Sequence, residues 1–243
     1  MTKNDKMAAS AQPSAQPSAQ PSAPAKPAEE FCTEMVFILD RSGSMAGKEP
    51  DTIGGFNSMI ERQKKEPGKA LVSTVLFDGV AEVLHDRVAL GDIAPMTAEE
   101  YFVRGCTALL DAVGGAIRHI GDIHKYARKE DVPDKTVFVI FTDGMENASH
   151  FYSRAEVRRQ IEAQKERFGW EFIFLGANID AAASAEQIGI DRRHAADFVC
   201  DSGGIEAAFN AAGKVLSSLP GCCCICEDWA DEVRMDFKKR GKK

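Results

Sequence analysis

The sequence predicts an α/β fold: a doubly wound, mostly parallel six-stranded sheet with one antiparallel edge strand and helices on both faces. Three observations predict it. Two apolar, β-branched runs, residues 35–40 and 135–143, each end at an aspartate, which is typical of buried parallel strands. Strand and helix patterns alternate along the chain, which indicates βαβ units. One connection, at Gly79, is too short for a crossover and therefore predicts an antiparallel hairpin.

The first half of the chain carries four expected elements after the strand at 35–40. Residues 51–66 have apolar side chains at helical spacing, and a Pro-Gly pair ends that run. Residues 69–78 and 80–90 are the two expected strands of the hairpin, since a single glycine separates them. A stripe of leucine, valine and isoleucine side chains at helical spacing predicts a helix over residues 107–123.

The second half of the chain continues this alternation. The strand at 135–143 is the most apolar one and is expected near the centre of the sheet. Ser153 and Glu156 form a capping box at the start of a charged helix over residues 153–168. The remaining expected elements are a strand over 170–177, a short helix over 181–188, a strand over 195–200 and a helix over 204–218.

Composition limits the class of protein. A chain of 243 residues, 44% of them hydrophobic, is long enough to bury one substantial core. The formal net charge of −7 argues against a nucleic-acid binder, because it disfavours contact with phosphate. The longest apolar runs, 35–39 and 137–141, are too short to span a bilayer. No apolar stretch follows Lys3 and Lys6, so no secretory signal is visible and a cytoplasmic location is expected.

The chain divides into three expected regions. Residues 11–22 repeat Ala-Gln-Pro-Ser three times, which predicts that residues 1–30 are a disordered tether. Residues 31–220 carry the alternating pattern and form the expected folded domain. Residues 221–243 contain a cysteine-rich segment and a basic ending, residues 236–243, which is expected to be solvated.

Oxygen-bearing side chains follow two of the predicted strands. Asp40, Ser42 and Ser44 come directly after the first apolar run, and Asp143 ends the most apolar one. Thr107 opens a helix after a glycine-containing loop that can approach the same edge of the sheet. Two carboxylates and three hydroxyls make an oxygen-only pocket, which suits Mg²⁺ or Mn²⁺ and offers little to zinc or copper. The sequence therefore predicts a divalent-metal site formed by these five residues.

The same three segments resemble the von Willebrand factor A (vWA) domain and its metal-ion-dependent adhesion site (MIDAS). The pattern of that family is Asp-x-Ser-x-Ser, then Gly-x-Thr, then Thr-Asp-Gly. It is matched here by Asp40, Ser42, Ser44, Gly105, Thr107, Thr142, Asp143 and Gly144. The resemblance covers residues 31 to about 220, and the element order with its edge hairpin also matches the Rossmann-like vWA fold.

The resemblance implies a function and a role for each site residue. In the family the two serines and the threonine usually touch the metal, whereas the aspartates often act through water. A carboxylate from a protein partner completes the coordination. The implied protein is therefore a stand-alone intracellular binding module rather than an enzyme. The family also implies a partner in an AAA+ ATPase system.

Two other functions compete with this interpretation. A phosphatase or hydrolase of the aspartyl-nucleophile type also begins with a strand-end aspartate, so Asp40 is a candidate nucleophile. That chemistry requires an acid two positions later, where this chain has Ser42. The other alternative is a metal-independent scaffold that binds through the tether and the tail.

Two features remain open at this stage. Side chains between residues 145 and 152, with Met45, either form a collar that contacts the partner or cap the next helix with aromatics folded inward. Four of the seven cysteines crowd into one short segment, either as a metal or redox site or as a buried patch. They are Cys222, Cys223, Cys224 and Cys226. The sequence also leaves open the partner's identity, the oligomeric state and any movement of the helix at 204–218.

Overall fold

The computed structural model describes residues 27–222 and 225–241, so most of the expected tether lies outside the described residues. Six strands form one sheet in the order β3-β2-β1-β4-β5-β6. All neighbours are parallel except β2 and β3, which pair antiparallel as the short connection predicts. The strands are β1 (Cys32–Asp40), β2 (Lys69–Phe77), β3 (Ala81–Ala89), β4 (Lys135–Thr142), β5 (Glu171–Gly176) and β6 (Ala195–Asp197). The predicted fold class is confirmed.

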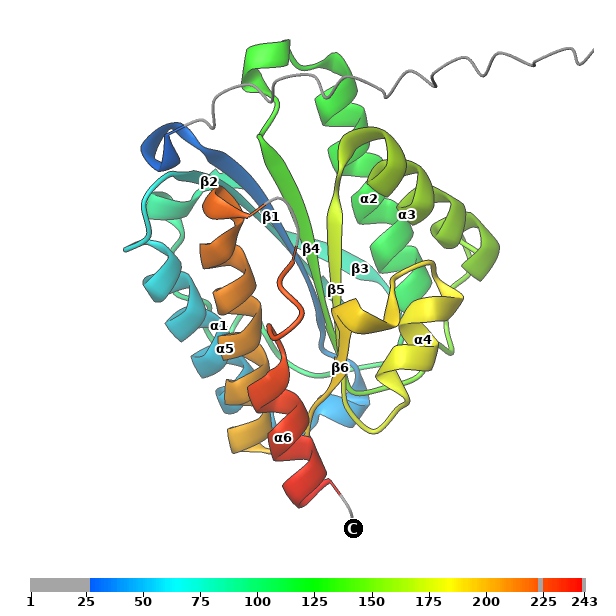
Figure 1. Ribbon diagram of the computed structural model, residues 1–243. Coiled ribbons are helices and arrows are strands. Elements are labelled where there is room, and N and C mark those ends of the chain that lie inside the picture. The colour runs from blue at the N-terminus through cyan, green and yellow to red at the C-terminus, as the bar shows by residue number, and fades with distance from the viewer. Residues whose placement is uncertain (1–26, 223–224, 242–243) are drawn as a thin grey trace, which may run out of the picture.

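Helices cover both faces of the sheet (Figure 1). On one face lie α1 (Glu49–Gln63), α5 (Ser202–Ser218) and α6 (Asp231–Arg240), and on the other lie α2 (Leu109–Tyr126), α3 (Arg154–Phe168) and α4 (Ala181–Gln187). Short 3₁₀ turns are η1 (Ala28–Glu30), η2 (Gly43–Met45), η3 (Leu90–Asp92), η4 (Lys129–Asp131), η5 (Arg192–His194) and η6 (Leu219–Gly221). No helix in the described part of the chain has both the length and the apolar character needed to cross a membrane.

The core has two halves because successive strand side chains point to opposite faces. Phe37 and Leu39 of β1 belong to the half that packs against α1 and α5. Val36 and Ile38 belong to the half that packs against α2, α3 and α4. All four side chains are fully buried, as expected for an interior strand covered on both faces.

The capping box predicted at the start of α3 is present. Glu156 N donates to Ser153 Oγ at 3.3 Å, and Ser153 N donates to Glu156 Oε2 at 2.8 Å. The helix ends at Gly169, whose φ of 63° lies in the left-handed region that favours glycine. Local sequence signals therefore define both ends of this helix.

The C-terminal region contains the helix α6, which packs against α5 and β6. Ile225, Trp229 and Val233 are buried, and the indole N–H of Trp229 donates to the carbonyl of Arg193 at 2.9 Å. These apolar residues are spaced four apart, so they fall on one side of the turn and helix that contain them. The described part of the basic ending, residues 236–241, follows these buried residues, and none of its side chains is buried.

The edge strand β3 is not a regular strand. Its pairing with β2 shifts register on either side of Thr74, and Arg87 has a positive φ of 52°. Arg87 N donates to the side chain of Ser73 instead of a strand carbonyl, at 3.1 Å. This irregularity is a β-bulge, which bends and twists the strand locally.

Candidate metal centre

The candidate site lies at the carboxyl ends of two central strands, β1 and β4. Leu39 of β1 pairs with Phe141 of β4, so the residues that follow each strand emerge side by side. Asp40 is the last residue of β1, and Asp143 directly follows β4. The helix that follows β1, α1, and the helix that follows β4, α3, lie on opposite faces of the sheet. This position is therefore a switch point, where open α/β sheets bind ligands.

A short chain of oxygen atoms runs between the two strand ends. Ser42 Oγ and Ser44 Oγ are 3.0 Å apart, and Ser44 Oγ donates to Asp143 Oδ1 at 2.5 Å. Asp40 holds the start of this loop, because its Oδ1 accepts from Ser42 N at 2.7 Å and its Oδ2 accepts from Thr142 Oγ1 at 2.5 Å. Four of the five predicted ligands are therefore brought together.

Asp40 is the most enclosed of the predicted ligands. Its side chain is fully buried, and this burial raises the pKa of its carboxyl above the ordinary value. Hydrogen bonds from Thr142 and Ser42 oppose that shift, while the nearby Asp143 carboxylate adds to it. A cation at the site would offset both the desolvation and the repulsion between the two carboxylates.

Thr107, the fifth predicted residue, faces the same space as Ser44. A Cβ placed at Gly144 would lie 3.3 Å from both Ser44 Oγ and Thr107 Oγ1. Because Gly144 has no side chain, a space remains between these two hydroxyl oxygens, and this space is the cradle at Gly144. Asn147 fixes the threonine loop, since its Oδ1 accepts from Thr107 N at 2.9 Å and its N–H donates to Thr107 O at 3.0 Å.

The donor set fits a hard divalent cation. Hydroxyl and carboxylate oxygens are ligands that Mg²⁺ and Mn²⁺ accept. Among residues 27–222 and 225–241, no three His, Cys, Asp or Glu side chains gather where they could hold a metal ion. The candidate site is of a different kind, because it combines two carboxylates with three hydroxyls and depends on the open cradle at Gly144.

A half-buried thiol also contacts the site, which the sequence analysis did not anticipate. Cys200 Sγ lies 3.7 Å from Asp143 Oδ2, oriented as a donor to that oxygen. Burial and the neighbouring Asp143 carboxylate raise the pKa of the Cys200 thiol to about 11. Without a bound metal, the thiol therefore stays protonated at neutral pH and donates to the carboxylate.

The expected collar of residues around the site is only partly exposed. Met145 and Phe151 are 73% and 84% exposed, as a partner-contacting rim requires. Met45 is fully buried and therefore does not belong to such a collar. Glu146 Oε2 accepts from Leu110 N at 2.8 Å, and it therefore caps the start of α2 instead of facing a partner.

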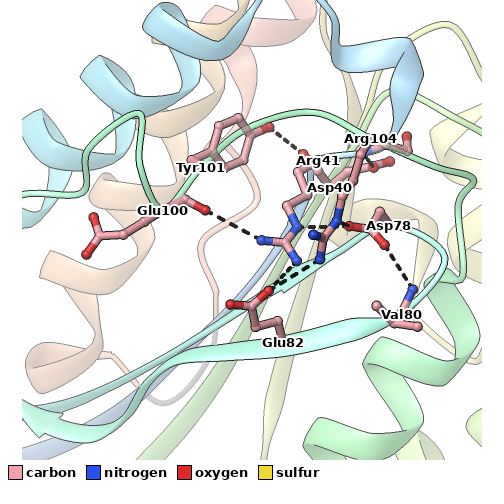
Figure 2. A network of polar contacts seen from close by, with 9 residues as sticks. Asp40, Arg41, Asp78, Val80, Glu82, Glu100, Tyr101 and Arg104 are labelled. Atoms are coloured by element: carbon pink, nitrogen blue, oxygen red, sulfur yellow. Dashed lines mark hydrogen bonds and ion pairs between the residues drawn. The ribbon is translucent and has the colours of Figure 1, made fainter.

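A network of charged side chains lies beneath the site loop (Figure 2). Arg41, between two predicted ligands, is fully buried; its Nε lies 3.0 Å from Asp78 Oδ2 and its Nη2 lies 2.5 Å from Glu82 Oε2. Arg104 reaches the same two acids, at 2.8 Å and 3.5 Å. Both guanidinium groups also lie about 5 Å from the Phe102 ring centre. Asp78, which follows β2, thus anchors two loops.

Burial alone would raise the pKa of Asp78, but the hydrogen bond from Arg104 and the charges of both arginines hold it below its ordinary value. The carboxylate therefore stays ionised between its two partners. A strand-end aspartate is an obvious sequence signal. The burial of an arginine in a turn has no such sequence signal, because most arginines in turns are solvated.

Backbone hydrogen bonds also join the segments that contain Arg41, Asp78 and Arg104. Arg104 N donates to Arg41 O at 2.9 Å, and Ala108 N donates to the carbonyl of Asp78 at 2.7 Å. The phenol of Tyr101 donates to the carbonyl of Asp40, as Figure 2 shows. Gly105, between the arginine and Thr107, has a φ of 68°, which explains the glycine at this position. The site loop, the β2–β3 turn and the threonine loop therefore form one connected unit.

Comparison with solved structures gives proteins of the vWA fold. Proximal thread matrix protein 1 (PTMP1) from the mussel byssus is 12% identical, with a TM-score of 0.52, over 77% of this chain and 47% of that chain. A von Willebrand factor type A protein from Catenulispora acidiphila is 14% identical, with a TM-score of 0.52, over 78% of this chain and 43% of that chain. This chain thus has the von Willebrand factor A fold, as predicted.

The match extends over less than half the length of those proteins. No protein-family model matches this sequence, and no curated protein matches it. A further PTMP1 structure, 13% identical with a TM-score of 0.52 over 77% of this chain and 46% of that chain, has a zinc-occupied MIDAS motif.

Proposed function

We propose that this chain is a protein-binding module whose contact with its partner depends on a divalent metal. The metal is Mg²⁺ or Mn²⁺. The observation that carries the proposal is the cradle at Gly144, where the hydroxyls of Ser44 and Thr107 face a space that no side chain fills. The fold of vWA domains and the zinc-occupied MIDAS of PTMP1 also support it.

The predicted ligands fall into two groups with different roles in this proposal. Ser42, Ser44 and Thr107 hold the ion through their hydroxyl oxygens. Asp143 and the enclosed Asp40 balance its charge and orient the surrounding waters. The metal supplies an open coordination position, which an acidic side chain of the partner fills. The exposed Met145 and Phe151 lie within eight residues of Asp143 in the chain and provide apolar contact area beside it.

The proposal is binding without turnover. Asp40 is fully buried, and its two oxygens accept hydrogen bonds from Ser42 N and from Thr142 Oγ1 of β4, which supports a role in holding the site rather than that of a nucleophile. A phosphatase or hydrolase predicts the opposite, an accessible carboxylate and turnover of phosphoesters. A metal-independent scaffold predicts that partner capture survives chelation. The cytoplasmic location and the AAA+ system remain predictions.

The experiment is calorimetric titration of the full chain with Mg²⁺, Mn²⁺ and Zn²⁺. Asp143→Ala removes a carboxylate and is expected to abolish binding. Gly144→Ala places a methyl group 3.3 Å from two of the ligand oxygens and is expected to weaken binding without removing any ligand. Gly115→Ala is the matched control, because a Cβ at Gly115 has open space around it.

Two results would contradict the proposal. If wild type and Asp143→Ala bind the metals equally, the ligands lie elsewhere. If an acidic partner is captured equally with and without EDTA, the scaffold function replaces the metal-dependent one. Circular dichroism of each variant checks that the fold is kept.

A further inference from the structure

The cysteine-rich segment between α5 and α6 is not used by the proposed function. Two of its four cysteines are described, Cys222 and Cys226, and both stand as thiols. Their sulfur atoms are 3.9 Å apart. Cys226 is exposed and Cys222 is partly exposed, so small solutes can reach the pair.

Buried neighbours hold each of the two thiols in place. Cys222 N donates to the carbonyl of Leu219 at 3.3 Å, and Leu219 is 1% exposed at the end of α5. On the other side, Trp229 N donates to the carbonyl of Cys226 at 3.3 Å, and the Trp229 indole is anchored in the core. Ile225, next to Cys226, is 5% exposed. The sulfur pair is therefore positioned by the fold on both sides.

We propose that Cys222 and Cys226 form a reversible intrachain disulfide by exchange with a low-molecular-weight disulfide such as glutathione disulfide. The observed separation is a contact distance between sulfurs, and rotation of the two side chains brings them to the bonded distance of about 2 Å. Cys222 and Cys226 are four positions apart in the chain and their sulfurs are already in contact, so no rearrangement of the core is required. The inference is independent of the metal site.

The exchange proceeds in two steps. The thiolate of one cysteine attacks a sulfur of glutathione disulfide, a mixed disulfide forms, and one glutathione thiolate leaves. The thiolate of the second cysteine then attacks the protein sulfur of that mixed disulfide. The bond between Cys222 and Cys226 forms and the second glutathione thiolate leaves. Two protons pass from the protein thiols to the two glutathiones, and the protein is oxidised by two electrons.

The new bond would tie the end of α5 to the segment that leads into α6. The other end of α6 is already tied to α5, because Arg240 Nη1 lies 2.5 Å from Asp201 Oδ2 and Asp201 caps the start of α5. Closing the loop between the two cysteines removes open conformations from the chain. Oxidation is therefore expected to slow the detachment of α6 from the domain.

To test the proposal, the full chain is oxidised with glutathione disulfide and the remaining thiols are alkylated. The chain is then digested with trypsin, and the peptide of residues 215–234 is fragmented in a mass spectrometer. The expected product carries a Cys222–Cys226 bond and two alkyl groups, on Cys223 and Cys224. It is expected to disappear in Cys222→Ser and in Cys226→Ser. It is expected to persist in the double variant Cys223→Ser/Cys224→Ser, and dithiothreitol should reverse it.

Three results would overturn the proposal. Alkylation of both Cys222 and Cys226 after oxidation, stable glutathione adducts on either one, or dimers linked through either one would each show that the pair does not close. Limited trypsinolysis tests the consequence for α6, with cleavage after Arg234 as the readout. Oxidation is expected to slow this cleavage in wild type and not in Cys222→Ser, and an equal rate in both would refute the link to α6.

Discussion

Replacement of Arg41 by methionine is the most direct test of the charged network under the site. Methionine keeps most of the apolar stem and removes the guanidinium that contacts Asp78 and Glu82. Breaking a buried ion pair from one side costs about 3–5 kcal/mol, because the remaining charge is left unpaired. Here Arg104 still reaches Asp78, and Glu82 is 59% exposed. The expected loss is therefore at the lower end, about 3 kcal/mol.

Urea denaturation followed by circular dichroism measures this loss as a change in the free energy of unfolding. In a domain of this size, each kcal/mol lowers Tm by about 2–4 °C, so Arg41→Met is expected to melt about 6–12 °C below wild type. The double variant Arg41→Met/Asp78→Asn is expected to recover part of the loss, because it removes a buried carboxylate that has lost one of its two arginine partners.

Arg104→Met is the matched control for Arg41→Met. Its side chain contacts the same two acids and the same aromatic ring, but it is 45% exposed, so solvent already screens its interactions. It is expected to destabilise the domain much less than Arg41→Met. If both variants lose the same stability, or if Arg41→Met loses none, burial does not make Arg41 the central residue of the network.

The remaining predictions concern other parts of the molecule. Burial raises the pKa of Asp40 above 3.8, so the folded chain binds a proton on this carboxyl more tightly than the unfolded chain does. The protonated carboxyl therefore contributes to the stability of the fold at low pH, and this contribution is lost as the pH rises. Asp40→Asn is expected to raise the free energy of unfolding at neutral pH without metal; an advantage over wild type that did not shrink on acidification would contradict this. Gly55→Ala would place a Cβ 2.5 Å from the Phe209 ring, and it is expected to lower the free energy of unfolding by about 1–3 kcal/mol in urea denaturation. The control is Gly54→Ala, whose Cβ meets open space and should stabilise α1. If both variants change the stability in the same direction, the packing argument is refuted. Ser153→Ala removes the α3 cap and should cost about 1 kcal/mol by the same assay, and no change would mean that the cap is redundant.

Much of the fold could be predicted because its signals are local. The apolar runs that became β1 and β4 end at Asp40 and Asp143, and both strands lie at the centre of the sheet. The antiparallel position of β3 follows from the single glycine in its connection. The capping box of α3 follows from two residues three positions apart. None of these inferences requires knowledge of distant contacts.

The parts that could not be predicted depend on contacts between distant segments. The burial of Arg41 depends on acids more than 35 residues later in the chain. The role of Glu146 at the start of α2 depends on a loop that folds back by 36 residues. The position of Cys200 beside Asp143 depends on the sheet order that brings β4 and the start of α5 together. Sequence spacing carries no record of such contacts.

The bulge in β3 has a consequence for how copies of this chain meet one another. An exposed edge strand offers unpaired backbone groups to any other extended chain, and regular edges promote aggregation by strand addition. The register shifts around Thr74 and the positive φ of Arg87 interrupt that row of groups. At the other edge, β6 has only three residues and α6 contacts it. The two edges are thus protected in different ways against pairing with another extended chain.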